Sequence, residues 1–306
     1  MSIAALARIA RWKVDGSFTS AEYLAGAELA FNSLNLNGAQ YADDGKENVI
    51  DDYTGLLAAS ELYATTQSAA YLSAARARAK SLIARLGTDG YFIADGASRP
   101  FWHASDAGLP VVALARFVEV ESDSKNADEA RQAIAKHLSY LLGISRSPAN
   151  PFGLARQHTA PGVATFFMPH INETQYWWQG ENARLGSLAA ASLLGAEAIG
   201  ATGDSYLELL RFAGWQVDWI LGNNPYDISF LRGFGKNNPA PFCASKAQAG
   251  TLVGGISNGI TGNNDDGTGI RWPTSSNSSC GDDWRTVEQW LPHAAWYMVA
   301  ITALAR

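Results

Sequence analysis

Cysteine, methionine and charged residues are scarce in this chain of 306 residues. It has two cysteines and three methionines, and Asp, Glu, Lys and Arg together make up 17% of it. There is no basic run and the formal net charge is −6, which argues against nucleic-acid binding. No apolar run approaches the ~20 residues of a membrane-spanning helix. The cysteines, Cys243 and Cys280, lie in predicted loops, where one disulfide and two free thiols are both open.

The first residues do not have the pattern of a secretory signal peptide. Arg8 and Arg11 interrupt the apolar segment, and no small-residue cleavage site follows it. An amphipathic helix is the better interpretation. Aromatic residues, in contrast, are abundant, with ten tryptophans and eleven tyrosines. Most of these rings are expected in cores and interfaces, but the excess favours a cleft in which flat rings face sugars.

Apolar residues at three- and four-residue spacing dominate the chain, which is typical of amphipathic helices. Short polar connections between them predict antiparallel neighbours. Two long connections, 145–176 and 223–286, are rich in Pro, Asn and aromatic residues. This organisation predicts an all-α fold of the α/α-barrel type, a single domain with long loops on one rim. Helices are predicted over Ile3–Trp12, Ser20–Asn35, Val49–Thr65, Ala69–Leu86, Ala104–Val120, Ala127–Leu142, Gln179–Gly200, Ser205–Leu221 and Val287–Ala305.

The segment Val217–Gly235, VDWILGNNPYDISFLRGFG, changes from helix to loop within a few residues. Gly222 supplies a helix stop, and the following Asn-Asn-Pro prevents continuation because proline lacks an N–H. The segment resembles the signature ILGxNPxxxSxxxGFG of glycoside hydrolase family 9, which contains inverting cellulases and related exo-acting enzymes.

The resemblance extends to three further segments. GTLVGGISNG at 250–259 is similar to the family's LVGGPN loop, and TVEQWLPHAAWYMVAITAL is similar to its final helix with the catalytic glutamate. DDYTGLLAASELYATTQSAAYL resembles the helix that begins with an acidic pair. Residues 1–306 therefore resemble the later two-thirds of an (α/α)6 catalytic barrel, truncated on its N-terminal side. We accordingly expect a second polypeptide or a swapped copy to cover apolar faces there, and a secreted or periplasmic location.

Glu288 is the candidate catalytic residue. An inverting glycosidase needs a carboxylic acid with a raised pKa to protonate the leaving oxygen, and a carboxylate opposite it to activate water. Glu288 matches the position of the family's acid, and apolar neighbours at the predicted helix start would keep it protonated. The residues alone favour a helix-capping glutamate, because first-turn glutamates are common. With the resemblance, we expect the general acid.

Two departures from the family pattern keep a second function open. The Asp-Ala-Gly-Asp motif that carries the family's base is absent, and Asp-Asp-Gly at 43–45 falls in the wrong place. The His-His-Arg cluster after GFG is replaced by PAPFCASK. The first hypothesis is inverting hydrolysis of a β-linked glucan or amino-sugar polymer. The second is a catalytically inert carbohydrate-binding barrel, or an enzyme fragment whose base is supplied elsewhere.

The loop Phe166–Arg184, FFMPHINETQYWWQGENAR, concentrates hydrogen-bonding groups beside two indoles, which suits recognition of sugar hydroxyls. The alternative is a solvated helix N-terminus with one tryptophan turned into the core. The expected substrate contacts are His170, Glu173, Trp177, Trp178, Arg184, Phe234, Trp290 and His293.

Acidic residues also allow a metal site, although the resemblance implies no cofactor for the chemistry. Calcium prefers several oxygen ligands, and many family members have a structural calcium near the acidic pair. Asp51 and Asp52 match that pair, and Asp106 matches an aspartate at a later helix start. The alternative is that these are helix N-terminal acids that interact with the helix dipole.

Overall fold

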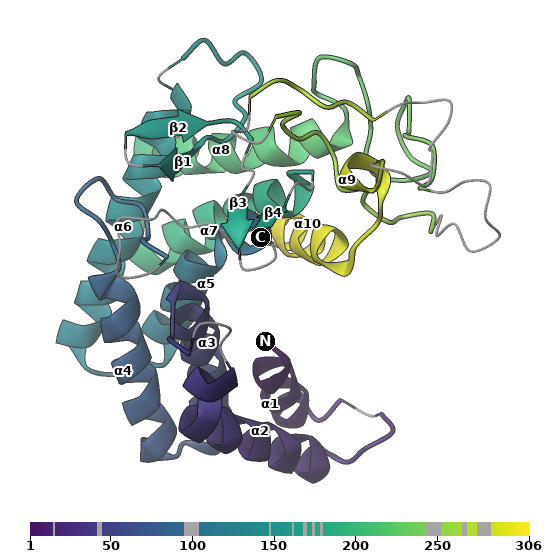
Figure 1. The fold of residues 1–306 in the computed structure, drawn as a ribbon. Helices are drawn as coiled ribbons and strands as arrows, with labels where there is room; N and C mark the ends of the chain where they lie inside the picture. Colours follow the sequence, from purple (N-terminus) through teal and green to yellow (C-terminus); the bar gives the residue numbers. More distant parts are fainter. Residues whose placement is uncertain are drawn as a thin grey trace. The chain divides into compact units, whose positions relative to one another are not determined.

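Helices make up most of the regular secondary structure in a computed structural model of the protein (Figure 1). The structure describes residues 1–14, 16–41, 45–94, 104–146, 148–160, 162–167, 170–172, 175–177, 180–242, 252–264, 268–273 and 283–306. These residues divide into two compact units. Unit 1 comprises Met1–Ser98 and Pro110–His137, and unit 2 comprises Arg99–Leu109 and Leu138–Arg306.

The connections from α3 to α4 and from α7 to α8 are short, whereas long segments separate α6 from α7 and α8 from α9. Unit 1 contains α1 (Ser2–Trp12), α2 (Ser20–Tyr41), α3 (Val49–Thr66), α4 (Ala69–Ala84), nearly all of α5 (Leu109–Val120) and the first part of α6 (Ser124–Arg146). Unit 2 contains the short 3-10 helix η1 (Ala104–Asp106), α7 (Asn182–Ile199), α8 (Gly203–Leu221), α9 (Trp284–Val287) and α10 (Leu291–Leu304). It also has two small antiparallel pairs, β1 (Gln157–Ala160) with β2 (Val163–Thr165) and β3 (His170–Asn172) with β4 (Gln175–Trp177).

The helix α3 is the centre of unit 1, where it packs against α1 and α4. Its N-terminus is closed by a capping box, in which the Asn48 side chain accepts the Ile50 N–H and the Asp51 side chain accepts the Asn48 N–H. Leu62 of α3 is buried with Ile3 of α1 in one apolar cluster. A capped N-terminus and the burial of apolar side chains therefore both stabilise α3.

Glu61 of α3 is a fully buried carboxylate surrounded by three guanidinium groups. Arg11 Nη2 lies 2.7 Å from its Oε2, Arg116 Nε lies 2.8 Å from its Oε1, and Arg8 also pairs with it. Burial alone would raise the pKa of Glu61, but the arginines outweigh burial and hold the pKa below its ordinary value of 4.5. One charged side chain thus ties α1 and α5 to α3.

The helix α7 is buried along most of its length and packs against α8, α10 and η1 in unit 2 (Figure 1). Small residues allow these close approaches. A Cβ at Gly108 would lie 1.9 Å from the Ser187 carbonyl oxygen, and a Cβ at Gly186 would lie 3.1 Å from Trp296. Unit 2 is therefore built around a helix whose neighbours contact its backbone directly.

The predicted all-α, (α/α)6-type fold is confirmed, and the helix positions agree with the sequence apart from their ends. Two predicted helices are interrupted. Residues 104–120 form η1 and then α5, and the predicted helix Val287–Ala305 is broken at 288–290. The prediction that Glu288 begins a helix is therefore wrong. It follows α9 with an extended backbone (φ −66°, ψ 149°), and α10 begins only at Leu291.

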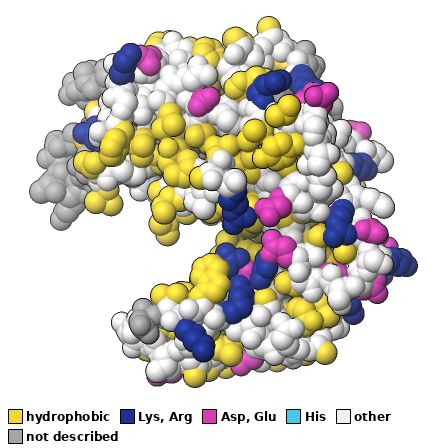
Figure 2. All heavy atoms as spheres, turned by 180° about the vertical axis from the view of Figure 1, so that it is seen from behind, with side chains coloured by type: hydrophobic (Ala, Val, Ile, Leu, Met, Phe, Trp, Pro, Cys, Tyr) yellow, Lys and Arg dark blue, Asp and Glu magenta, His cyan; other side chains and the backbone are white. Residues whose placement is uncertain are grey.

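Apolar side chains remain exposed on α2 and α10. Leu29 and Leu36 of α2 are exposed, as are Met298 and Ile301 of α10, and Figure 2 shows apolar patches among the charged side chains of one face. The expectation that a second polypeptide covers such faces stays a prediction. None of the helices in the described ranges is both long and apolar enough to cross a membrane.

Glu61→Gln keeps the size of the side chain but removes the negative charge that three guanidiniums share. We expect the free energy of unfolding at pH 7 to fall by about 2–4 kcal/mol, because three partly buried arginines lose the carboxylate that they share. Urea unfolding measures this difference. Glu119→Gln is the matched control, because the Glu119 side chain is 60% exposed on the same Arg116 and its loss should cost less than about 1 kcal/mol.

The Glu61 contribution also has a defined pH dependence. The pKa of Glu61 is lower in the folded protein than in the unfolded chain. Its ionised carboxylate therefore stabilises the fold at pH values above 4.5, and this stabilisation is lost as the pH falls through the lowered pKa. The difference between wild type and Glu61→Gln should therefore shrink at acidic pH. A difference that is independent of pH would contradict the assignment of the effect to charge.

Candidate active site

Glu288 is held by its backbone between two helices. In a continuous helix its carbonyl oxygen would accept the N–H of residue 292, but that residue is Pro292, which has none. The Asn258 N–H donates to the Glu288 carbonyl instead, at 2.8 Å, and the Gly259 N–H donates to Thr286 O at 2.8 Å. Pro292 is tolerated because it lies in the first turn of α10. Backbone hydrogen bonds from residues 258 and 259 thus fix the position of Glu288.

The N-terminus of α7 fixes the loop that binds Glu288. The Asn182 N–H donates to Asn258 O at 3.0 Å, and the Asn182 side chain donates to Ser257 O at 2.9 Å. Gly259 has φ +99°, and a Cβ there would lie 2.5 Å from the Asn182 side chain, so glycine is required. Gly180 donates its N–H to Arg285 O at 2.7 Å. Three segments distant in the sequence therefore share one hydrogen-bonded frame.

The environment of the Glu288 carboxyl suits an acid. Burial raises the pKa of Glu288, and the hydrogen bond that its Oε2 accepts from Trp290 Nε1 lowers the pKa by a smaller amount. The net shift is upward, which keeps the proton on the carboxyl at higher pH than for an exposed glutamate. Trp290 lies two residues from the acid and is half-buried. The pair therefore combines a protonatable carboxyl with a directional indole donor.

His293 and Arg184 lie below the surface. His293 is fully buried, and burial lowers its pKa to about 3, so the ring is neutral. In the described part of the chain neither of its ring nitrogens has a hydrogen-bond partner. Arg184 pairs with Glu181 and donates to Phe166 O at 2.8 Å. Neither side chain therefore faces solvent.

Phe234 is displayed on a turn. Its ring is 55% exposed, and the turn is closed by Asn238, whose side chain accepts the Gly233 N–H at 3.0 Å and donates to Phe234 O at 2.9 Å. Tyr226, earlier in the same loop, contacts Trp272 with ring centroids 4.0 Å apart. The loop after α8 thus presents aromatic rings on an ordered backbone, in accord with the helix-to-loop change in the sequence.

The predicted contacts of the 166–184 loop are only partly described. The backbones of His170 and Trp177 are partners in the β3–β4 pair, but their side chains lie outside the description. Glu173 and Trp178 lie outside the described residues altogether, as do Cys243 and Cys280.

Two residues of this frame were not predicted from the sequence: Asn258, which binds the Glu288 carbonyl, and Asn182, which binds the Asn258 loop. The signal was present in the SNG triplet of GGISNG, where an Asn-Gly pair marks a special turn.

The predicted calcium ligand Asp52 is engaged by cationic side chains. Arg78 Nη1 lies 3.2 Å from Asp52 Oδ1, while Arg85 Nε and Ser81 Oγ donate to Asp52 Oδ2. Positive charge is therefore already supplied at this carboxylate, and its two oxygens do not fit a calcium site as they stand.

The other two aspartates also have protein partners. Asp51 accepts the Asn48 N–H at 2.8 Å, and Asp106 accepts the Trp296 indole N–H at 2.7 Å. No group of three or more His, Cys, Asp or Glu among the described residues could hold a metal ion.

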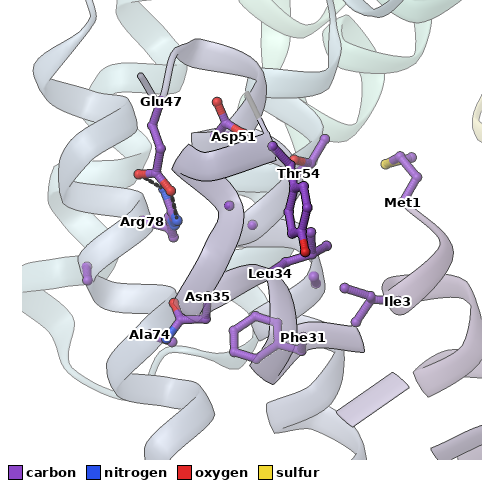
Figure 3. A pocket seen from close by; sticks show the side chains of 15 residues that line it. Met1, Ile3, Phe31, Leu34, Asn35, Glu47, Asp51, Thr54, Ala74 and Arg78 are labelled. Carbon is purple, nitrogen blue, oxygen red and sulfur yellow. Dashed lines mark hydrogen bonds and ion pairs between the residues drawn. The ribbon is translucent and has the colours of Figure 1, made fainter. Parts of the chain in front are cut away.

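A cavity of about 340 Å³ in unit 1 is lined by α1, α2, α3 and α4 (Figure 3). Its walls are mainly apolar, with Phe31 and Leu34 on one side. Glu47 and Arg78 form a bidentate ion pair, in which two guanidinium nitrogens each lie 2.7 Å from a carboxylate oxygen. The hydrogen bonds from Arg78 lower the pKa of Glu47, so this carboxyl is ionised and does not suit a proton donor. None of the predicted substrate contacts lines this cavity.

Comparisons with known proteins agree on one family. The family model "Glycosyl hydrolase family 9" matches residues 2–271 of this chain. Endoglucanase 7 of Oryza sativa subsp. japonica is 29% identical over 144 residues, which are 45% of this chain and 26% of that protein. The solved GH family 9 endoglucanase J30 has a TM-score of 0.64 at 19% identity, over 99% of this chain and 53% of that chain.

A Bacteroides ovatus GH9 structure gives a TM-score of 0.62 at 17% identity over 99% of this chain and 52% of that chain. The cellulase Cel9M of C. cellulolyticum gives a TM-score of 0.61 at 16% identity, over 99% of this chain and 62% of that chain. At these identities the structures indicate the fold alone. The chain spans between half and two-thirds of the length of these solved relatives.

Trp290→Phe tests the electrostatics of the site directly. It removes the indole N–H that stabilises the charged carboxylate and leaves the burial in place, so the pKa of Glu288 should rise further. A carboxyl ¹³C NMR titration measures this, with the Glu288 signal identified by its loss in Glu288→Gln. A pKa that stays the same or falls would show that the indole does not stabilise the carboxylate.

Proposed function

Because the chain belongs to glycosyl hydrolase family 9, we propose that it hydrolyses a β-linked glucan or an amino-sugar polymer with inversion, using Glu288 as the general acid. The observation that carries this proposal is the half-buried Glu288 carboxyl, whose pKa is raised and whose backbone is fixed by Asn258. Two relatives are endoglucanases by name, which favours the glucan.

The chemistry assigned to Glu288 is proton donation. Breaking the glycosidic bond leaves negative charge on the departing oxygen, and a positioned carboxylic acid neutralises it in the transition state. Burial keeps Glu288 protonated for this step, while the Trp290 hydrogen bond orients the carboxyl and stabilises the carboxylate that forms. The same indole therefore acts as a positioning group before proton transfer and as a donor after it.

The proposed sugar-binding surface consists of aromatic and polar groups. Phe234 and Trp290 offer exposed or half-exposed rings. Arg184 and His293 are buried, so their proposed part is to support this surface from behind. The proposed direct contacts are His170, Glu173, Trp177, Trp178, Phe234 and Trp290.

Glu288→Gln is the central test, because the amide keeps the shape but cannot donate the proton. Hydrolysis of natural glycosides should fall by at least ~10²-fold, since their leaving groups need protonation. Activated aryl glycosides, whose leaving groups need little protonation, should lose much less. Reducing-end release and aryl-group release measure the two rates on a panel of β-glucans, chitosan and aryl glycosides.

Glu197→Gln is the matched control, because Glu197 is exposed and pairs only with exposed Arg306 among the described residues. It should leave both rates unchanged. An equal loss on both substrate types in Glu288→Gln would assign Glu288 a structural role. Oligosaccharide binding without any hydrolysis by the wild-type chain would favour the inert carbohydrate-binding barrel.

The family resemblance predicts a structural calcium, whereas the arginines at Asp52 favour a site without an ion, and chelation distinguishes the two. Because Arg78 and Arg85 already neutralise Asp52, we expect excess chelator to leave the melting temperature unchanged. Bound calcium would stabilise the folded protein by mass action, so a melting temperature that falls with chelator and recovers with calcium would establish the site instead.

A further inference from the structure

A second cavity, of about 280 Å³, lies in unit 2, and its lining residues have no part in the proposed function. It opens between the C-terminal end of α6, the loop 148–153 and one face of α8. Its apolar wall contains the half-buried Leu142 and the buried Phe212, and its open side contains Trp215. None of its lining residues belongs to the frame around Glu288.

Trp215 forms an aromatic wall that the neighbouring loop is shaped to receive. A Cβ at Gly153 would lie 2.2 Å from the Trp215 ring, so the indole packs directly on the glycine backbone. Gly153 also has φ +61°, which other residues rarely adopt. Trp215 as a whole residue nevertheless remains 37% exposed. Its contact with Gly153 holds the ring in place and leaves part of it open to the cavity.

The loop that supports Trp215 is fixed on both sides. Gln216 donates to Gly153 O and accepts the Ala155 N–H, both at 2.9 Å. Asn150 donates to Ser145 O and to Leu154 O, both at 2.9 Å. A ligand would therefore meet walls that are already ordered, which lowers the entropic cost of binding.

Charged groups line the same face of α8 at helical spacing. Glu208, Arg211 and Trp215 are three and four residues apart, so they lie along one stripe. Glu208 Oε1 lies 2.9 Å from Arg146 Nη2 at the end of α6. Arg211 is exposed and has no partner among the described side chains. The cavity thus offers one satisfied ion pair, one additional guanidinium and one indole.

We propose that this cavity is a second carbohydrate-binding site that takes a neutral β-linked hexose unit of a longer chain. An indole suits the C–H face of a pyranose ring, while guanidinium donors and a carboxylate acceptor suit its hydroxyls. Glu208 and Arg146 neutralise each other, and the exposed Arg211 guanidinium is solvated without a ligand, so the polar rim does not require a charged ligand. The volume lies just below the ~300–1,000 Å³ of typical ligand pockets, which fits a single sugar unit. The choice of a glucan rests on the proposed function.

Direct observation of Trp215 is the first test. The Glu288→Gln protein, labelled with 5-fluorotryptophan, prevents cleavage during a titration with a neutral β-1,4-gluco-oligosaccharide. The Trp215 ¹⁹F resonance is identified by its absence in Trp215→Phe. We expect this resonance to shift and to saturate. A Trp215 resonance that stays in place, whether or not other tryptophans respond, overturns the proposal, as does a response to an acidic oligo-uronide alone.

Affinity electrophoresis in a gel that contains soluble hydroxyethyl cellulose is the second test. Trp215→Ala should weaken the apparent affinity by about tenfold, the loss expected of a central aromatic contact. Arg211→Ala should weaken it in the same direction, and its exposed side chain can be removed without disturbing the core. Tyr206→Ala is the matched control, because this tyrosine is 40% exposed on the same helix but does not line the cavity.

The outcomes separate this inference from the proposed function. A Trp215 shift without any hydrolysis by the wild-type chain would reject the enzyme and retain the binding site. Glu288-dependent hydrolysis with an unresponsive Trp215, and equal mobility of the Trp215, Arg211 and Tyr206 variants, would reject the binding site and retain the enzyme.

Discussion

The hydrogen bond between the Asn258 N–H and the Glu288 carbonyl oxygen is the interaction on which the candidate active site depends. Pro292 makes it necessary, because a continuous helix would leave the Glu288 carbonyl without its donor. Once α9 and α10 separate, the glutamate occupies an extended position. The loop 256–261 then connects it to the N-terminus of α7 through Asn182. The position of one carboxyl therefore depends on backbone bonds between distant segments.

Burial has opposite consequences for the acidic side chains of this protein, and the neighbouring charges decide which one applies. Glu61 is buried among three arginines and has a lowered pKa. Glu288 is partly buried, and in the described part of the chain its carboxyl accepts a hydrogen bond from a neutral indole, so its pKa is raised. The first arrangement stabilises helix packing, and the second retains a proton for transfer. Desolvation without a compensating cation therefore distinguishes the candidate acid from a structural carboxylate.

Arginines have a second structural effect in unit 1. Asp52, expected from the family resemblance to hold calcium, is contacted by Arg78 and Arg85. A guanidinium supplies positive charge and fixed hydrogen-bond directions, so it can satisfy a buried carboxylate at a helix N-terminus. The aspartate can therefore stabilise α3 and α4 without an ion. An aspartate at this position can therefore bind arginines in place of an ion when arginines are its neighbours.

The sequence by itself determined the all-α architecture, because apolar spacing specifies which helix faces are buried and polar connections specify where helices end. Motifs that lie within short segments also predicted Glu288 as the candidate acid and an aromatic loop after α8. The sequence could not show the extended position of Glu288, because the carbonyl that Pro292 leaves without a donor is satisfied by Asn258, which is distant in the sequence. It could not show that Arg184 and His293 are buried, because burial is decided by which helices and loops pack around α7 and α10. Contacts such as Trp215 on Gly153 were likewise decided only in the tertiary structure, since they join segments whose proximity no local pattern records.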